Sequence, residues 1–179
     1  MKPRTRSADP TAVLPHLSPT KMITSRPFSL ADYESCLEMF DANTPDNFAP
    51  NERDDYERFI AASPSFYRVC LVEEKVVGAY GIAIDTQKSR GRIRWIMTTV
   101  SSRGIGLGRF MMLELLDHAR EMGIGFIDIA ASQKSASFFE HYGAMEQTRE
   151  PEGWGPGLDQ VTMELKLAGS NIVRPPGAA

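Results

Sequence analysis

The sequence predicts a single α/β domain, and three features of its pattern predict it. Runs rich in apolar and β-branched residues alternate with segments whose apolar residues recur at helical spacing. A glycine-rich loop at residues 103–108 stands between one such run and an amphipathic segment, which is a strand-loop-helix order. A length of 179 residues allows one domain with a full core and is short for two. We therefore expect one folded unit over residues 22–167.

Composition and charge exclude several classes of protein. The formal net charge of -3 gives no basic excess for binding nucleic acid or a membrane surface. Cys36 and Cys70 are too few for a disulfide framework or a metal cluster. No apolar run approaches the roughly 20 residues of a membrane span. We expect a cytoplasmic protein with a small-molecule partner and no metal, acting as a monomer or homodimer.

Both ends of the chain are expected to lie outside the domain. Residues 1–21 combine several prolines with Ser, Thr and charged residues, which predicts a disordered N-terminal tail. They also lack the apolar core of a signal peptide. Residues 168–179 contain two further prolines and two glycines, which predicts a flexible C-terminal tail.

The first half of the domain is expected to hold a strand, two helices and an antiparallel meander. The strand covers residues 22–27, and apolar residues at helical spacing follow it as far as Phe40. A proline-broken passage leads to a second helix at 52–62. Strands are predicted at 66–73, 76–85 and 93–100.

Three arginines stand at alternate positions where the third of these strands begins. Arg90, Arg92 and Arg94 would share one face of an extended segment. They could contact phosphate at the mouth of a cofactor site, or they could form a solvated edge, which is the alternative we favour.

The second half is expected to continue with helices and strands in alternation. The helix after the glycine loop ends at Gly123, and a strand at 126–130 implies a parallel right-handed crossover. Ser132 or Ser135 can cap a helix that ends at Gly143. A strand at 145–148, a wide turn at 152–157 and an alternating last strand at 161–167 complete the domain.

The glycine loop is expected to bind phosphate. Glycines at every second position let the backbone approach a ligand, and the following helix directs unpaired N–H groups at it. A nucleoside-triphosphatase loop would need Lys and then Ser or Thr, where this chain has Arg109 and Phe110. A dinucleotide loop would need Gly or Ala at the sixth position from its first glycine, where this chain has Arg109 or Met111. Both classes are excluded.

The loop resembles the Q/R-x-x-G-x-G/A motif of the GNAT superfamily of acetyl-CoA-dependent N-acetyltransferases, matched by Arg103, Gly106 and Gly108. The order of predicted elements resembles that family over nearly the whole domain. The resemblance implies a GNAT fold, in which a mixed, mostly antiparallel central sheet splays between two parallel strands and has helices on both faces. It also implies acetyl-CoA as co-substrate and direct attack of a neutral amine on the thioester.

The resemblance further assigns residues to the cofactor. Main chain at Met97 and Thr98 should face the pantetheine and the acetyl carbonyl. Ser132 stands where the family often has Asn, and Phe139 where it often has Tyr. Backbone N–H groups should hold the pyrophosphate of coenzyme A at Arg103, Gly104, Ile105, Gly106, Leu107, Gly108 and Arg109.

Two residues are candidates for catalytic roles. In many relatives the tyrosine protonates the departing sulfur, which Phe139 cannot do. Tyr142, three residues on, could replace it, or could be a packed tyrosine with a wet hydroxyl. A thiol with a pKa near 8.5 can also leave with little help. Asp128 is a candidate base in an apolar strand, because burial would raise its pKa; alternatively it reaches solvent or a backbone partner.

The acceptor is expected to lie at residues 43–52 and 149–159, the two segments that relatives use for recognition. Trp154 could form an aromatic wall or simply cover an edge of the domain, and Asp46, Glu52 and Asp159 could attract a cation. A small amine is slightly preferred over a protein amine. The competing hypothesis, motivated by Phe139, is a sensor or scaffold that binds acetyl-CoA without turnover.

Overall fold

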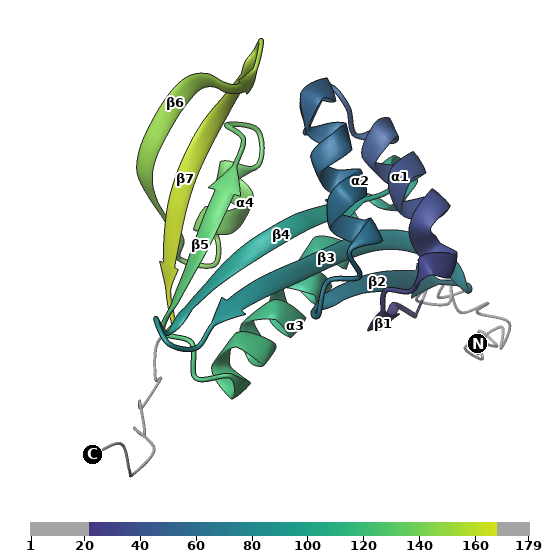
Figure 1. Cartoon of the computed structure of the whole chain (residues 1–179), viewed down its shortest axis with the longest axis horizontal. Helices are drawn as coiled ribbons and strands as arrows, with labels where there is room; N and C mark the ends of the chain where they lie inside the picture. Colours follow the sequence, from purple (N-terminus) through teal and green to yellow (C-terminus); the bar gives the residue numbers. More distant parts are fainter. Residues whose placement is uncertain (1–21, 168–179) are drawn as a thin grey trace, which may run out of the picture.

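A computed structural model describes residues 22–167, and the tails expected at 1–21 and 168–179 lie outside the described residues. The described chain alternates helices and strands in the predicted order (Figure 1). The elements are β1 (Thr24–Pro27), η1 (Leu30–Asp32), α1 (Tyr33–Ala42), η2 (Pro50–Glu52), α2 (Arg53–Ala61), β2 (Tyr67–Val72), β3 (Lys75–Asp85), β4 (Arg90–Thr98), η3 (Val100–Ser102), α3 (Leu107–Glu121), β5 (Phe126–Ala131), α4 (Ala136–Glu140), β6 (Met145–Gly155) and β7 (Leu158–Lys166).

The strands form one 7-stranded sheet in the order β1-β2-β3-β4-β5-β7-β6. Neighbouring strands are antiparallel except β4 and β5, which run parallel. α3 makes the connection between these two strands, as the strand-helix-strand pattern predicts. The mixed, mostly antiparallel sheet with helices on both faces confirms the predicted fold class.

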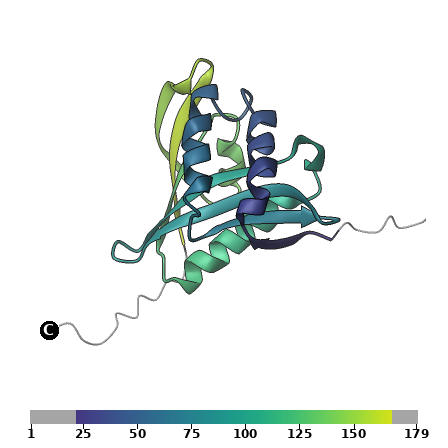
Figure 2. The ribbon, with the colours of Figure 1, turned by 45° about the vertical axis from the view of Figure 1, so that its right-hand side comes forward.

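Two layers of helices cover the sheet. Figure 2 shows α1 and α2 above one face and α3 beneath the other. Buried residues of α1 and α2 form one core cluster with β2 and β3. Buried residues of α3 and α4 form a second cluster with β5 and β7. A β4 side chain therefore lies on the side of α1 and α2 or on the side of α3 and α4, depending on the face of the sheet from which it projects.

Two element boundaries differ from the sequence expectation. β6 continues to Gly155 through most of the predicted wide turn, and the turn is confined to Pro156 and Gly157. The β6–β7 register shifts between Glu150 and Gly155, so the glycine-rich stretch is an irregular strand. β4 begins at Arg90 because residues 90–92 pair with β3 in spite of their charge and glycine.

The two cysteines are buried and free. Burial raises the pKa of Cys36 to about 11 and that of Cys70 to about 12, so both thiols stay protonated near neutral pH. No group of residues suited to hold a metal occurs between residues 22 and 167. No helix of that part is long and apolar enough to span a bilayer.

Candidate active site

β4 and β5 pair for only part of their length. Residues 90–92 lie opposite residues 126–128, and the two strands share no further partner residues. Beyond that vertex β5, β7 and β6 diverge from β4 (Figure 1). A cavity of about 970 Å³ lies in the fork. It is lined by both strands, the glycine loop, the first turns of α3, the region of α4, the α1–α2 connection, one residue of β6 and one residue of α2, Asp55, which forms an ion pair with Arg58.

A bulge in β4 shapes one wall of this cavity. Trp95 has a φ of 47° and, together with Ile96, lies opposite the single residue Tyr80. The Trp95 carbonyl accepts a hydrogen bond from the Tyr67 hydroxyl at 3.0 Å. That hydroxyl also lies 3.0 Å from the hydroxyl of Tyr56, on α2. The bulge is therefore held in place from the neighbouring strand and helix.

The bulge directs two consecutive side chains towards α2. The Arg94 guanidinium lies 5.1 Å from the centre of the Phe59 ring, and the Trp95 ring lies 5.1 Å from the Tyr56 ring. Successive residues on a regular strand would face opposite ways. Trp95 Nε1 is the one buried side-chain polar atom without a hydrogen-bond partner among the described residues. Unpartnered donors thus gather in this wall.

The glycine loop has the backbone of an anion site. Gly104 and Gly106 have φ values of 83° and 85°, and nothing lies within 4 Å of where a Cβ would stand on either. The first helical hydrogen bond of α3 runs from the Phe110 N–H to the Gly106 carbonyl at 3.0 Å. The N–H groups of residues 104–109 have no acceptor elsewhere in the described chain. This set of free donors at a helix start fits the phosphates of coenzyme A.

Asn43 fixes the loop relative to the rest of the fork. Its Nδ2 donates to the Met39 carbonyl at 2.8 Å and to the Thr98 carbonyl at 2.9 Å, and its Oδ1 accepts a hydrogen bond from Arg103 at 3.4 Å. Asn43 is buried. Through these three hydrogen bonds it links the end of α1, the end of β4 and the start of the loop.

Most residues assigned to the cofactor from the sequence line the cavity. Ile105 does not, and it is 41% exposed. Ser132 is buried, and its N–H donates to the Ser135 hydroxyl at 3.1 Å at the start of α4. Their contacts with a cofactor stay predictions. The lining residues of this set are Met97, Thr98, Arg103, Gly104, Gly106, Leu107, Gly108, Arg109, Ser132 and Phe139.

The environment expected for Asp128 is wrong. Its side chain is 40% exposed and does not line the cavity. Its two oxygens accept hydrogen bonds from Arg90 at 3.1 and 2.5 Å, and Arg90 also binds Glu164 at 2.6 Å. The Arg90 hydrogen bonds lower the pKa of Asp128, outweighing partial burial. Arg90 therefore joins β4, β5 and β7 at the vertex, and Asp128 lacks the raised pKa on which its assignment as a base depended.

Tyr142 also lies away from the cavity. Its ring packs at 5.4 Å from the Phe138 ring, and Phe138 and Phe139 line the cavity instead. Phe138 would lie 3.1 Å from a Cβ placed on Gly108, so this ring packs directly on the glycine loop. The wall at α4 is apolar, and Tyr142 stands behind it.

One of the three carboxylates expected to attract a cation lines the cavity. Asp159 accepts a hydrogen bond from the Glu152 N–H at 3.1 Å, and Asp46 lies 3.7 Å from Lys134. Glu52 alone reaches the cavity.

Glu52 has the environment that was expected of Asp128. Burial raises its pKa, and Asp55 adds to this effect, while a hydrogen bond from the Ala49 N–H at 2.7 Å opposes it. No cation lies within ion-pair distance of Glu52 in the described part of the chain. The sequence named it only as a cation site. A proline followed by Glu two residues later is a helix-start pattern that could have placed its carboxylate.

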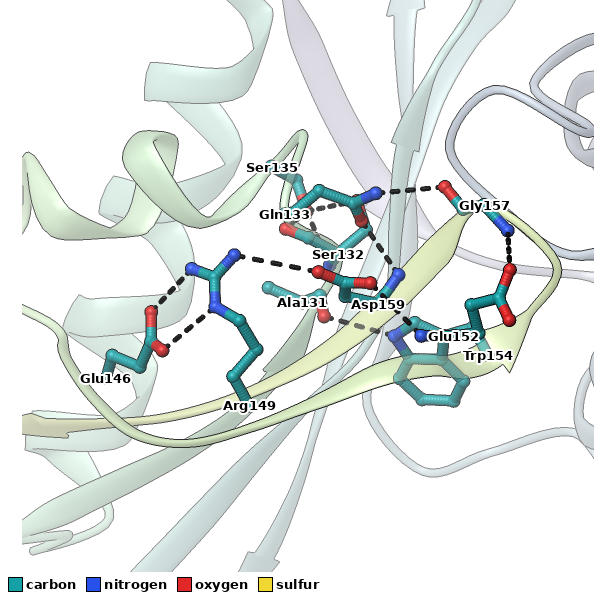
Figure 3. A network of polar contacts seen from close by, with 10 residues as sticks. All are labelled: Ala131, Ser132, Gln133, Ser135, Glu146, Arg149, Glu152, Trp154, Gly157 and Asp159. Carbon is teal, nitrogen blue, oxygen red and sulfur yellow. Dashed lines mark hydrogen bonds and ion pairs between the residues drawn. The ribbon is translucent and has the colours of Figure 1, made fainter.

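Trp154, on the β6–β7 hairpin, lines the cavity and belongs to a network of polar contacts drawn in Figure 3. Its Nε1–H donates to the Ala131 carbonyl, at the end of β5, at 3.0 Å. Gln133 braces the same hairpin: its Nε2 donates to the Gly157 carbonyl and its Oε1 accepts from the Asp159 N–H, both at 2.9 Å. The aromatic wall expected at Trp154 is therefore part of the cavity and fixed to β5.

Known structures share this fold. Ard1 from Thermoplasma volcanium is 19% identical, with a TM-score of 0.70 over 82% of this chain and 99% of that one. The Escherichia coli ribosomal-protein-S18-alanine N-acetyltransferase is 15% identical, with a TM-score of 0.68 over 84% and 99%. A phosphinothricin acetyltransferase from Sinorhizobium meliloti, in complex with acetyl-CoA, is 21% identical, with a TM-score of 0.66 over 81% and 88%. At these identities the likeness shows the fold alone.

The match to a sequence model of a protein family identifies the family of this chain. Comparison with curated proteins finds no match, but the model of the acetyltransferase (GNAT) family matches residues 34–144, which is more than half of the chain. The matched segment contains nearly all of α1, the whole of α2, β4, the glycine loop and β5. The chain therefore belongs to the GNAT acetyltransferase family and is an acetyl-CoA-dependent acetyltransferase.

Proposed function

We propose that this acetyltransferase acetylates a primary amine of a small molecule by direct attack, with Glu52 accepting the proton of the amine. The proposal is carried by one observation: Glu52 is the carboxylate in the cavity whose pKa is raised and which no cation neutralises. A carboxylate of that kind can remove a proton near neutral pH. We also keep the cytoplasm as its location, which agrees with two free, buried thiols.

The donor end of the cavity would hold the co-substrate by its phosphates. The free N–H groups of residues 104–109 and the guanidinium groups of Arg103 and Arg109 supply donors for the pyrophosphate. Met97 and Thr98 would lie along the pantetheine, and Ser132 and Phe139 would lie across the fork from them. These contacts fix the position of the acetyl group between β4 and β5.

Acetyl-CoA supplies an activated acetyl group: as the amine nitrogen bonds to the carbonyl carbon, the carbon–sulfur bond breaks and its electron pair leaves with the sulfur. Glu52 takes the proton that the nitrogen loses. Phe138 and Phe139 offer no proton to the sulfur, and Tyr142 lies behind them. We propose that the thiolate leaves without an acid from α4, because a thiol pKa of ~8.5 makes it a good leaving group.

The shape of the acceptor end supports a small acceptor. Two aromatic side chains of the lining, Trp154 and Phe48, are held in place: Trp154 by its indole hydrogen bond to β5, and Phe48 by stacking on Phe40 at 5.0 Å. Both rings line the cavity. Two fixed aromatic walls suit a compact molecule better than a polypeptide end, which needs an open groove.

Release of thiol from acetyl-CoA tests the proposal. The purified protein should release thiol in proportion to the product when small amines are added, and short peptides with free N-termini should be poor acceptors. Efficient turnover of peptides alone would instead support a protein amine as acceptor. Tight binding of coenzyme A with no acceptor-dependent release for any amine would support the sensor or scaffold.

A further inference from the structure

The arginines of the described chain fall into two sets. Arginines outside the cavity each lie within ion-pair distance of a carboxylate. These are Arg26, Arg53, Arg58, Arg68, Arg90, Arg120 and Arg149. The arginines that line the cavity, Arg92, Arg94, Arg103 and Arg109, have no such partner within residues 22–167. Among the described residues, the guanidinium groups without a carboxylate partner are therefore all in the lining of the cavity.

Two of these arginines lie away from the glycine loop. Arg94 precedes Thr98, the last residue of β4, by four residues, and the bulge at Trp95 lies between them. Arg92 lies at the vertex of the fork, opposite Asp128. Asp128 is already bound to Arg90, so it does not neutralise Arg92 fully. Phosphates held at the loop would leave this pair of guanidinium groups free.

Arg94 is held in an environment that disfavours its charge. It is half-buried, and the Phe59 ring, whose centre lies 5.1 Å from the guanidinium, offsets only part of the cost of burying the charge. Burial and the neighbouring charge of Arg92 lower its pKa. The Trp95 Nε1–H beside it is buried without an acceptor. An anion between β4 and α2 would offset each of these costs.

The same cavity contains an unpaired negative charge. Glu52, on the α2 side, is not within ion-pair distance of Arg92 or Arg94, although all of them line the cavity. Acidic and basic side chains that face one cavity without pairing are complementary to a ligand that carries both charges. A simple amine would satisfy Glu52 and leave both arginines unmatched.

We propose that the acceptor is an amino acid, whose carboxylate binds Arg92 and Arg94 while its amine lies beside Glu52. This inference rests on the proposed function and adds the chemical class of the acceptor. Bidentate hydrogen bonds from a guanidinium would orient the carboxylate, and with it the amine, towards the acetyl group.

Matched acceptors test the inference. Each amino acid of a panel is compared with its decarboxylated amine and its carboxamide, with thiol release as the readout. We expect kcat/KM to be at least about tenfold higher for some amino acids than for their partners, because a charge-assisted pair is lost in each comparison.

Variants show whether the arginines cause this preference. Arg94→Gln and Arg92→Gln should raise KM for the amino acid, leave its decarboxylated partner unchanged and leave coenzyme A affinity unchanged. Arg94→Lys should recover part of the loss. Arg120→Gln is the matched control, since Arg120 lies on α3 in an ion pair with Asp117 outside the cavity. Arg92, which is exposed, provides a variant that should not disturb folding.

Each other outcome overturns the inference. Equal turnover of amines with and without a carboxylate refutes it while leaving the small-amine acetyltransferase intact. Weaker binding of coenzyme A to Arg94→Gln would assign the arginines to the co-substrate. Turnover of peptides but of no free amino acid refutes it together with the small acceptor.

Discussion

The two ends of the cavity are built in different ways. The donor end is backbone from one continuous segment, residues 103–109, whose N–H groups point out of a helix start. The proposed acceptor end is made of side chains from η2, β4 and β6, namely Glu52, Arg94, Trp95 and Trp154. A backbone site depends on a local glycine pattern, whereas a side-chain site depends on how distant elements pack. The two ends should therefore respond to different mutations.

The largest effect is expected at the acceptor end. Glu52→Gln keeps an acceptor for the Ala49 N–H but removes the proposed base, so kcat should fall about 10²- to 10⁴-fold. Wild-type kcat/KM should decrease as pH falls through the raised pKa of Glu52, because the carboxylate must be ionised to take a proton. When kcat/KM is measured by thiol release as a function of pH, the variant should not show this decrease at low pH.

Glu57→Gln is the matched control, because it makes the same replacement of a carboxylate by an amide. Glu57 lies on α2 outside the cavity and contacts Arg53 and Tyr33. Its variant should keep the wild-type profile. If Glu52→Gln kept the wild-type kcat and the same decrease of kcat/KM at low pH, another group would have to be the base.

The next effect is expected at the donor end. Gly106→Val places a branched side chain at a φ of 85°, and strain of about 1–2 kcal/mol should weaken coenzyme A binding roughly 5- to 30-fold in calorimetry. Gly123→Val is the matched control, since Gly123 has a φ of 68° at the far end of α3. Equal loss of affinity in both variants would mean that the effect comes from general destabilisation and not from the loop.

A smaller effect separates Asp128 from Glu52. Asp128→Asn should lower the free energy of unfolding by about 0.5–1 kcal/mol, as a partly exposed ion pair is lost, and should leave kcat unchanged. The pKa of Asp128 is lowered in the folded state, so its contribution is complete above its unfolded pKa and disappears as pH falls through the lowered value. Denaturant unfolding at neutral and acid pH measures this difference. A large loss of kcat with unchanged stability would restore Asp128 as the base.

No change in kcat is expected for Tyr142→Phe, because the hydroxyl stands behind Phe138 and does not line the cavity. Steady-state kinetics at saturating substrates measures it. A large fall in kcat would show that α4 moves and that Tyr142 is the acid suggested by the sequence.

The same contrast explains what the sequence could predict. Arg103, Gly106 and Gly108 predict the proposed donor end because the spacing of glycines and the start of a helix are local properties. The order of strands and helices follows from periodicity, and it was predicted nearly in full. The sequence pattern was least informative for β6, where a bulge and the pairing with β7 extend the strand through glycine residues.

The acceptor end could not be predicted in the same way. Asp128 and Glu52 are both carboxylates near apolar residues, and their pKa values move in opposite directions because Arg90 reaches one and no cation reaches the other. Arg90 lies 38 residues before Asp128. Only the packing of β4 against β5 brings the two together.

Coenzyme A binding to Glu52→Gln and Gly106→Val, measured by calorimetry in one series, tests the separation of the two ends most directly. Glu52→Gln should bind coenzyme A as tightly as the wild type, while Gly106→Val should bind it more weakly. Equal weakening of both variants would contradict the account, because it would place Glu52 at the donor end.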